Sequence, residues 1–123
     1  MDLPTYSAPE KRTNKSVFLS EAEFQMLDFL TEATRCPSAS DCLRLLVKHE
    51  YMDVTDGKRQ RSEFISVRNR RMEKRQSYRL SKDEQQYLNH VCEFFGDTES
   101  AVIRHVVRYY YAVFKAMKDA DNE

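Results

Sequence analysis

The feature that most constrains how this 123-residue chain can fold is a short unit that occurs twice. In residues 75–80, Tyr78 and Leu80 fall on one side and Arg75, Ser77 and Arg79 on the other, which is the period of a half-buried strand. Residues 14–19 match this stretch by position, Ser16 with Ser77 and Leu19 with Leu80. Each stretch ends in Leu followed by Ser, and a glutamate follows the serine by three residues, at Glu23 and at Glu84. This S-x-x-E spacing is that of a capping box, which begins a helix. The sequence therefore predicts, at two places 61 positions apart, a strand that leads directly into a helix.

In the first unit, apolar residues at helical spacing predict a helix over about 21–35 and a second helix from Ser38 to about Met52. The two helices are separated at Cys36-Pro37, because proline disfavours helix in the residue before it. The segment 64–67 that follows is expected either as a short extra strand or as a stretch that lies against the core.

In the second unit, the same pattern predicts a helix over about 82–95 and a last helix from Thr98 to about Lys118. Gly96-Asp97 separates them and is suited to a helix C-cap. Residues 98–104 match residues 38–44 position for position, so the repeat includes the start of each second helix.

A six-residue strand leaves backbone groups unpaired, so each predicted strand needs a partner, and the repeat supplies one. Antiparallel pairing would place Val17, Leu19, Tyr78 and Leu80 against the helices. The outer face would then carry Asn14, Ser16, Phe18, Arg75, Ser77 and Arg79. The predicted fold class is mainly α with a short antiparallel β-ribbon, and the pairing is either within one chain or between two. The predicted organisation is a mobile arm at 1–13, a first unit at 14–52, a basic linker at 53–74, a second unit at 75–118 and an acidic tail at 119–123.

The charge of the chain is zero overall but unevenly distributed. Residues 58–82 hold ten Lys and Arg against Glu63 and Glu73, a local charge of +8, and the rest of the chain carries −8. Such segregation favours a polyanionic partner, and the alternative is a basic linker that is simply solvated. No apolar run approaches the roughly 18 residues of a membrane span, and residues 1–4 lack the pattern of a signal peptide. We therefore expect a cytoplasmic protein without a membrane partner.

Cysteine and histidine residues are few, and their spacing does not fit a metal site or a catalytic triad. The three cysteines, Cys36, Cys42 and Cys92, form no C-x-x-C pair, which disfavours a zinc site and a disulfide framework. The histidines, His49, His90 and His105, have no carboxylate or cysteine at ligand or triad spacing. We expect no enzyme activity, no metal, no cofactor and no small-molecule substrate.

The order of these motifs, and their repetition, resembles the ribbon-helix-helix family of DNA-binding proteins over about 14–52 and 75–115. The resemblance implies two tandem β-α-α copies whose paired strands enter the DNA major groove. Carried over by position, the base-contacting side chains would be Arg75, Ser77, Arg79, Asn14, Ser16 and Phe18. Phe18 departs from the usual polar residue, and would meet either a thymine methyl group or another protein surface.

The same resemblance places the start of each second helix against DNA phosphate. The implied residues are Ser38, Ala39 and Ser40, and Thr98, Glu99 and Ser100, although the carboxylate of Glu99 is unfavourable beside a phosphate. Arg44 and Arg104 match a common family arginine, for which a phosphate contact and a salt bridge are both open. The charge of the linker adds Arg68, Arg70 and Arg71 as candidate phosphate contacts.

The expected function is sequence-specific binding of double-stranded DNA as a transcriptional repressor. One alternative, from tandem versions of the fold, is an accessory protein that binds and bends DNA in the relaxosome of a conjugative element. Another is an antitoxin-type module that binds a protein. Because the two strands differ in sequence, pairing within one chain would favour an asymmetric DNA site.

Overall fold

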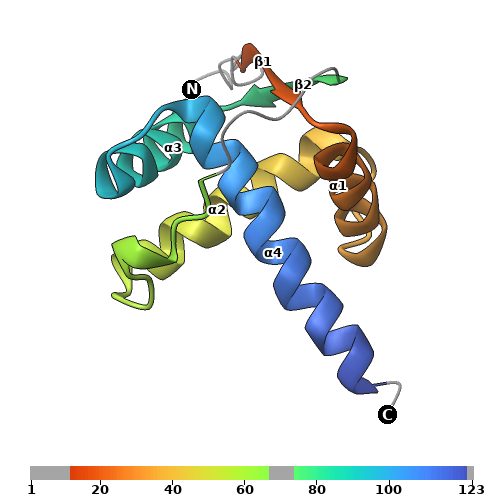
Figure 1. The fold of residues 1–123 in the computed structure, drawn as a ribbon. Helices are drawn as coiled ribbons and strands as arrows, with labels where there is room; N and C mark the ends of the chain where they lie inside the picture. Colours follow the sequence, from red (N-terminus) through yellow and green to blue (C-terminus); the bar gives the residue numbers. More distant parts are fainter. Residues whose placement is uncertain (1–11, 67–73, 122–123) are drawn as a thin grey trace, which may run out of the picture.

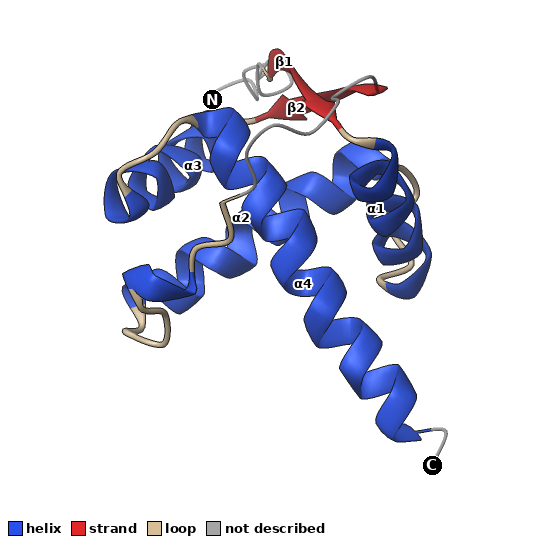
Figure 2. Ribbon diagram, in the orientation of Figure 1, coloured by secondary structure: helices blue, strands red, loops and turns tan. Residues whose placement is uncertain are grey.

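The computed structural model describes residues 12–66 and 74–121. The elements in these ranges are β1 (Thr13–Leu19), α1 (Glu21–Ala33), α2 (Ala39–Thr55), a 3-10 turn η1 (Arg61–Glu63), β2 (Lys74–Leu80), α3 (Lys82–Phe95) and α4 (Glu99–Asp121). The protein is mainly helical, with one two-stranded antiparallel sheet and four helices in the described ranges, as predicted (Figure 2). No helix in this part of the chain has the length and apolar character needed to cross a membrane.

The two strands form a ribbon at one end of the molecule, with the helices beneath it (Figure 1). Ser16 lies opposite Ser77 at the centre of the antiparallel register, and the pairing extends over all seven residues of each strand. In this structure both strands belong to one chain, which is the first of the two pairings that the sequence allowed.

The inner face of the ribbon closes the hydrophobic core, as predicted. Val17, Leu19, Tyr78 and Leu80 retain 1%, 0%, 3% and 0% of their exposure. They belong to a single cluster with apolar side chains from all four helices, among them Leu27, Leu30, Leu43, Leu46, Leu88, Val91, Ile103 and Val106. Burial alternates along the end of each strand, which separates a buried face from a face that stays open to solvent.

Both predicted capping boxes are present. The N–H of Glu23 donates to Ser20 Oγ at 3.2 Å, and the N–H of Ser20 donates to Glu23 Oε1 at 2.9 Å. Ser81 and Glu84 exchange the same two bonds at 3.2 Å and 2.8 Å. Each strand consequently turns into its helix at a fixed residue.

Three helix ends differ from the prediction. α1 ends at Ala33, because Arg35 adopts a left-handed conformation with φ +58° before Pro37. α2 continues to Thr55, where Val54 is still buried in the protein. α4 continues to Asp121, supported by an ion pair between Lys115 and Asp119 at 3.7 Å, so residues 119–121 are helical and form no separate tail. The predicted C-cap at Gly96 is confirmed, with φ +70°.

The described part of the predicted linker packs against the helices. Phe64 contacts the rings of Phe95 and His105, with centroids at 4.8 Å and 4.9 Å, so Phe64 lies against the core, and residues 64–66 form no strand. Val67 and residues 1–11 of the predicted arm lie outside the described residues, and Thr13 already belongs to β1.

Candidate nucleic-acid interface

The open face of the ribbon carries the side chains that were predicted to contact bases. All six are exposed, and Phe18 keeps 53% of its surface in contact with solvent. The register arranges them as three cross-strand pairs: Asn14 opposite Arg79, Ser16 opposite Ser77, and Phe18 opposite Arg75. Directly opposed side chains in an antiparallel ribbon have their Cβ atoms about 5 Å apart, so each pair presents one joint surface.

A hollow of about 520 Å³ opens on this face, and we call it the ribbon hollow. Its lining is Asn14, Lys15, Ser16, Ser40, Arg75, Ser77, Tyr78 and Arg79. This set contains three cations and no carboxylate. Within the described residues, neither Arg75 nor Arg79 forms an ion pair, so both guanidinium groups are available to an external anion or base.

The start of α2 lies beside the ribbon. The N–H of Arg79 donates to Ser40 Oγ at 3.3 Å, which joins the helix start to β2. Ser38 acts as the N-cap, since its Oγ accepts the N–H of Asp41 at 3.2 Å and donates to Asp41 Oδ2 at 2.9 Å. Both serine hydroxyls are thus engaged within the protein. The first N–H groups of α2, at Ala39 and Ser40, are the groups there that suit an anion, because they lie at the positive end of the helix dipole.

The start of α4 has a different charge. Thr98 Oγ1 accepts the N–H of Ala101 at 3.2 Å, and Ser100 is exposed. The Glu99 carboxylate accepts Lys15 Nζ at 2.7 Å and Gln85 Nε2 at 3.1 Å. This helix start therefore carries a carboxylate that Lys15 partly neutralises, whereas α2 has Ala39 at the matching position of the sequence repeat.

Arg44 and Arg104 form salt bridges, which was one of the two roles left open for them. Arg44 Nε donates to both Glu84 oxygens at 3.0 Å and 2.9 Å. Arg104 Nε donates to both Glu23 oxygens at 3.0 Å. Each arginine of a second helix thereby binds the capping glutamate of the other unit. Arg108 adds a third bond to the buried Glu23, at 2.8 Å.

These bonds determine the ionisation of both capping glutamates. Burial alone would raise the pKa of Glu23 and of Glu84. The backbone N–H of the N-cap serine and the arginines outweigh burial, so both pKa values lie below their ordinary range. Both carboxylates are therefore ionised at neutral pH and hold the two units together.

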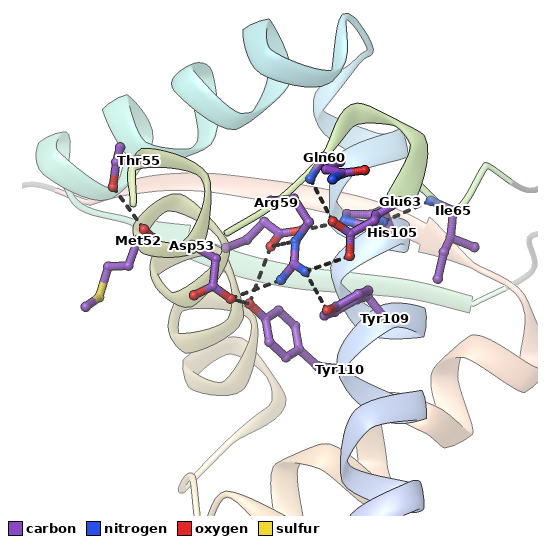
Figure 3. A network of polar contacts seen from close by, with 11 residues as sticks. Met52, Asp53, Thr55, Arg59, Gln60, Glu63, Ile65, His105, Tyr109 and Tyr110 are labelled. Carbon is purple, nitrogen blue, oxygen red and sulfur yellow. Dashed lines mark hydrogen bonds and ion pairs between the residues drawn. The ribbon is translucent and has the colours of Figure 1, made fainter. Parts of the chain in front are cut away.

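A buried polar network under the linker was not predicted (Figure 3). Its centre is Arg59, one of the ten cations of residues 58–82, and its side chain is only 4% exposed. Arg59 Nε donates to Glu50 Oε1 at 2.8 Å and Nη2 donates to Asp53 Oδ2 at 3.0 Å, both on α2. Nη1 bonds Glu63 at 3.3 Å and the hydroxyl of Tyr109 on α4. The charge of Arg59 is consequently neutralised, and the linker offers less positive charge than its sequence indicates.

His105 extends the network on α4, and both His105 and Glu50 are fully buried. The N–H of Ile65 donates to His105 Nδ1 at 3.0 Å, so Nδ1 is an acceptor and the proton of a neutral imidazole lies on Nε2. That proton is directed at Glu50 Oε2. The bonds from His105 and Arg59 outweigh burial and lower the pKa of Glu50. The network thus attaches residues 59–65 to both α2 and α4, and the carboxylate partner of His105 lies 55 positions away in the sequence.

A second hollow, of about 420 Å³, lies between α1 and the end of α4. Its lining is Phe29, Glu32, Ala33, Phe114, Met117, Lys118 and Asp121. Met117 is 57% exposed at its edge. No sequence prediction covered this surface.

Arg68, Arg70 and Arg71 lie outside the described residues, so their predicted phosphate contacts have no structural counterpart here. Comparison with family models, curated proteins and solved structures finds no match for this chain. The ribbon and the helix starts beside it are therefore the features that bear on function.

Proposed function

We propose that this chain is a sequence-specific double-stranded DNA-binding protein of the tandem ribbon-helix-helix type, and that it acts as a transcriptional repressor. The observation that carries the proposal is the outer face of the ribbon, where three polar or aromatic pairs lie over a cationic hollow. A two-stranded ribbon fits the major groove, which is about 12 Å wide and presents a distinct donor and acceptor pattern for each base pair.

The side chains on this face match the chemistry of base edges. An arginine such as Arg75 or Arg79 can donate two hydrogen bonds to guanine, and the Asn14 amide suits adenine. Arg79 lies beside the start of α2, whose N–H groups suit a backbone phosphate. Base contacts and a positioning contact would therefore come from adjacent parts of one surface.

Two observations support a pseudo-two-fold arrangement of the repeats. Ser16 and Ser77 are equivalent in the sequence repeat, and they also lie opposite each other in the register. A two-fold axis through that pair would exchange the strands. The same axis would exchange the Arg44–Glu84 and Arg104–Glu23 ion pairs, as in a self-complementary dimer interface.

The proposal is tested by selection from random duplex DNA at about 150 mM salt, where non-specific binding is suppressed. We expect the wild type to recover a motif, and Arg75→Ala with Arg79→Ala to lose it, since each bidentate arginine–guanine contact is worth about 1–3 kcal/mol. Lys48→Ala with Lys58→Ala is the matched control, because it removes the same charge from exposed positions outside the ribbon. Equal loss in the control, or no motif for the wild type, would contradict the proposal.

A function in DNA transfer, as a relaxosome accessory protein, would use the same surface as repression. The position of the recovered motif, at a promoter or at a transfer origin, separates the repressor from the relaxosome accessory protein.

Protein binding of the antitoxin type is the second candidate function, and the apolar hollow between α1 and α4 favours it. A protein that uses only this hollow would enrich no DNA motif, and Met117→Lys would abolish its complex while leaving DNA binding unchanged.

A further inference from the structure

We propose that the DNA site of this chain is non-palindromic, with one half contacted by Asn14 and Arg79 and the other by Phe18 and Arg75. The inference rests on the proposed function and assigns the chemistry of each half-site. Two comparisons lead to it. The strand register shows which residues lie opposite each other, and the sequence repeat shows which residues are equivalent.

A pseudo-two-fold axis through Ser16 and Ser77 compares two outer positions of the ribbon. It superposes Asn14 on Arg75, and Phe18 on Arg79. Only the central position keeps the same residue on both strands. Asn14 places an amide where the other strand has the cation Arg75. Phe18 places an aromatic ring where the other strand has the cation Arg79.

The two ends of the ribbon consequently prefer different bases. At the end beside α2, Asn14 suits adenine and Arg79 suits guanine, both through hydrogen bonds. At the opposite end, Arg75 suits guanine while Phe18 has no hydrogen-bonding group. The chemical partner of an exposed aromatic ring in the major groove is the 5-methyl group of thymine.

The exposure of Phe18 supports this assignment. The ring keeps 53% of its surface in solvent, next to polar neighbours on the same face. Apolar area of that size gains stability when a partner covers it. A thymine methyl group supplies such cover in the groove that the neighbouring arginine also enters.

The test compares the motif of the wild type with that of a symmetrised protein, Asn14→Arg with Phe18→Arg. Both positions are exposed, so the fold should be retained, which circular dichroism checks. We expect a non-palindromic motif for the wild type and a palindromic motif with guanine at both ends for the double variant. Ser62→Arg with Gln86→Arg adds the same charge at exposed positions outside the ribbon and should keep the wild-type motif.

A second arm isolates Phe18. Uracil replaces thymine, position by position, in the recovered duplex, which removes only the methyl group. Uracil in the Phe18 half should weaken binding about fourfold, the worth of one buried methyl group, and uracil in the other half should have no effect. In Phe18→Ser this difference should disappear.

The outcomes separate the two proposals. A palindromic motif for the wild type overturns the asymmetric site and leaves DNA binding standing. The contact of Phe18 with thymine is overturned if uracil weakens binding equally in both halves of the site. It is also overturned if Phe18→Ser keeps the wild-type loss of binding on uracil substitution in the Phe18 half. If neither protein enriches a motif, the proposed function itself fails.

Discussion

At the scale of single residues, the chain places an arginine in its interior and surrounds it with acceptors. Arg59 has carboxylates from Glu50, Asp53 and Glu63 within 3.3 Å, and its guanidinium carbon lies 3.9 Å from the centroid of the Tyr109 ring. A buried ion pair adds little over a well-packed apolar pair, but removal of one partner leaves the other charge uncompensated. The cost of replacing Arg59 is therefore mostly the cost of leaving the buried Glu50 carboxylate without its cation.

Arg59→Met should lower the free energy of unfolding by about 3 kcal/mol, because it leaves the Glu50 carboxylate buried beside His105 without a cation. The measurement is urea unfolding followed by circular dichroism. Lys58→Met removes the same charge one residue earlier at an exposed position, and should change stability by less than about 0.5 kcal/mol. Equal effects of the two substitutions would mean that Arg59 is solvated in solution.

This network marks the limit of what the sequence predicts. Arg59 lies in a basic segment without helical period, and nothing local distinguishes it from its exposed neighbours Lys58 and Arg61. One signal was available on α2, where Glu50 occupies the apolar stripe of the helix. The stripe consists of Leu43, Leu46, Val47, Glu50 and Val54, and all five are buried. A buried glutamate at that position needs a cation or hydrogen-bond donors beside it, but the sequence does not say which residues supply them.

At the scale of elements, the signals were local and their predictions were largely correct. Alternation set the faces of β2, and the positional match of the repeat set those of β1. The S-x-x-E spacing set the start of α1 and α3, because a capping box depends on residues within one turn. The helix ends were less predictable, since burial of Val54 and the ion pair of Lys115 with Asp119 extend α2 and α4. The role of Arg44 and Arg104 needed the packing of one unit on the other.

The two capping glutamates provide an internal comparison. Glu23 is fully buried and binds Arg104 and Arg108, whereas the Glu84 side chain is 15% exposed and binds Arg44. Glu23→Ala should therefore cost about 3–5 kcal/mol, since it removes the buried carboxylate that Arg104 and Arg108 share, and Glu84→Ala about 1–2 kcal/mol. Urea unfolding of the two variants measures the difference. A larger loss for Glu84→Ala would mean that burial of the pair does not govern its contribution.

At the scale of the whole molecule, acid should weaken the fold at several places together. Glu23, Glu50 and Glu84 have pKa values below the ordinary 4.5 in the folded chain, because hydrogen bonds and cations outweigh their burial. The unfolded chain then binds more protons than the folded chain below that pH, so acid favours unfolding. The stabilisation is fully present above about pH 4.5 and is lost as the pH falls through the lowered values.

The urea midpoint should consequently fall steeply as the pH drops below about 4.5. Glu84→Gln should show a shallower fall, because one of the three carboxylates no longer takes up a proton on unfolding. A midpoint that does not change between about pH 5 and pH 3 would contradict the ionised state of these groups in the folded chain.

Since β1 and β2 are parts of one chain, their pairing does not depend on how many copies are present. Strands from two chains separate on dilution, and the folded fraction of such a dimer falls with its concentration. A covalent connection instead holds the second strand at an effective concentration on the order of millimolar. The ribbon therefore forms as completely in a very dilute solution of this protein as in a concentrated one.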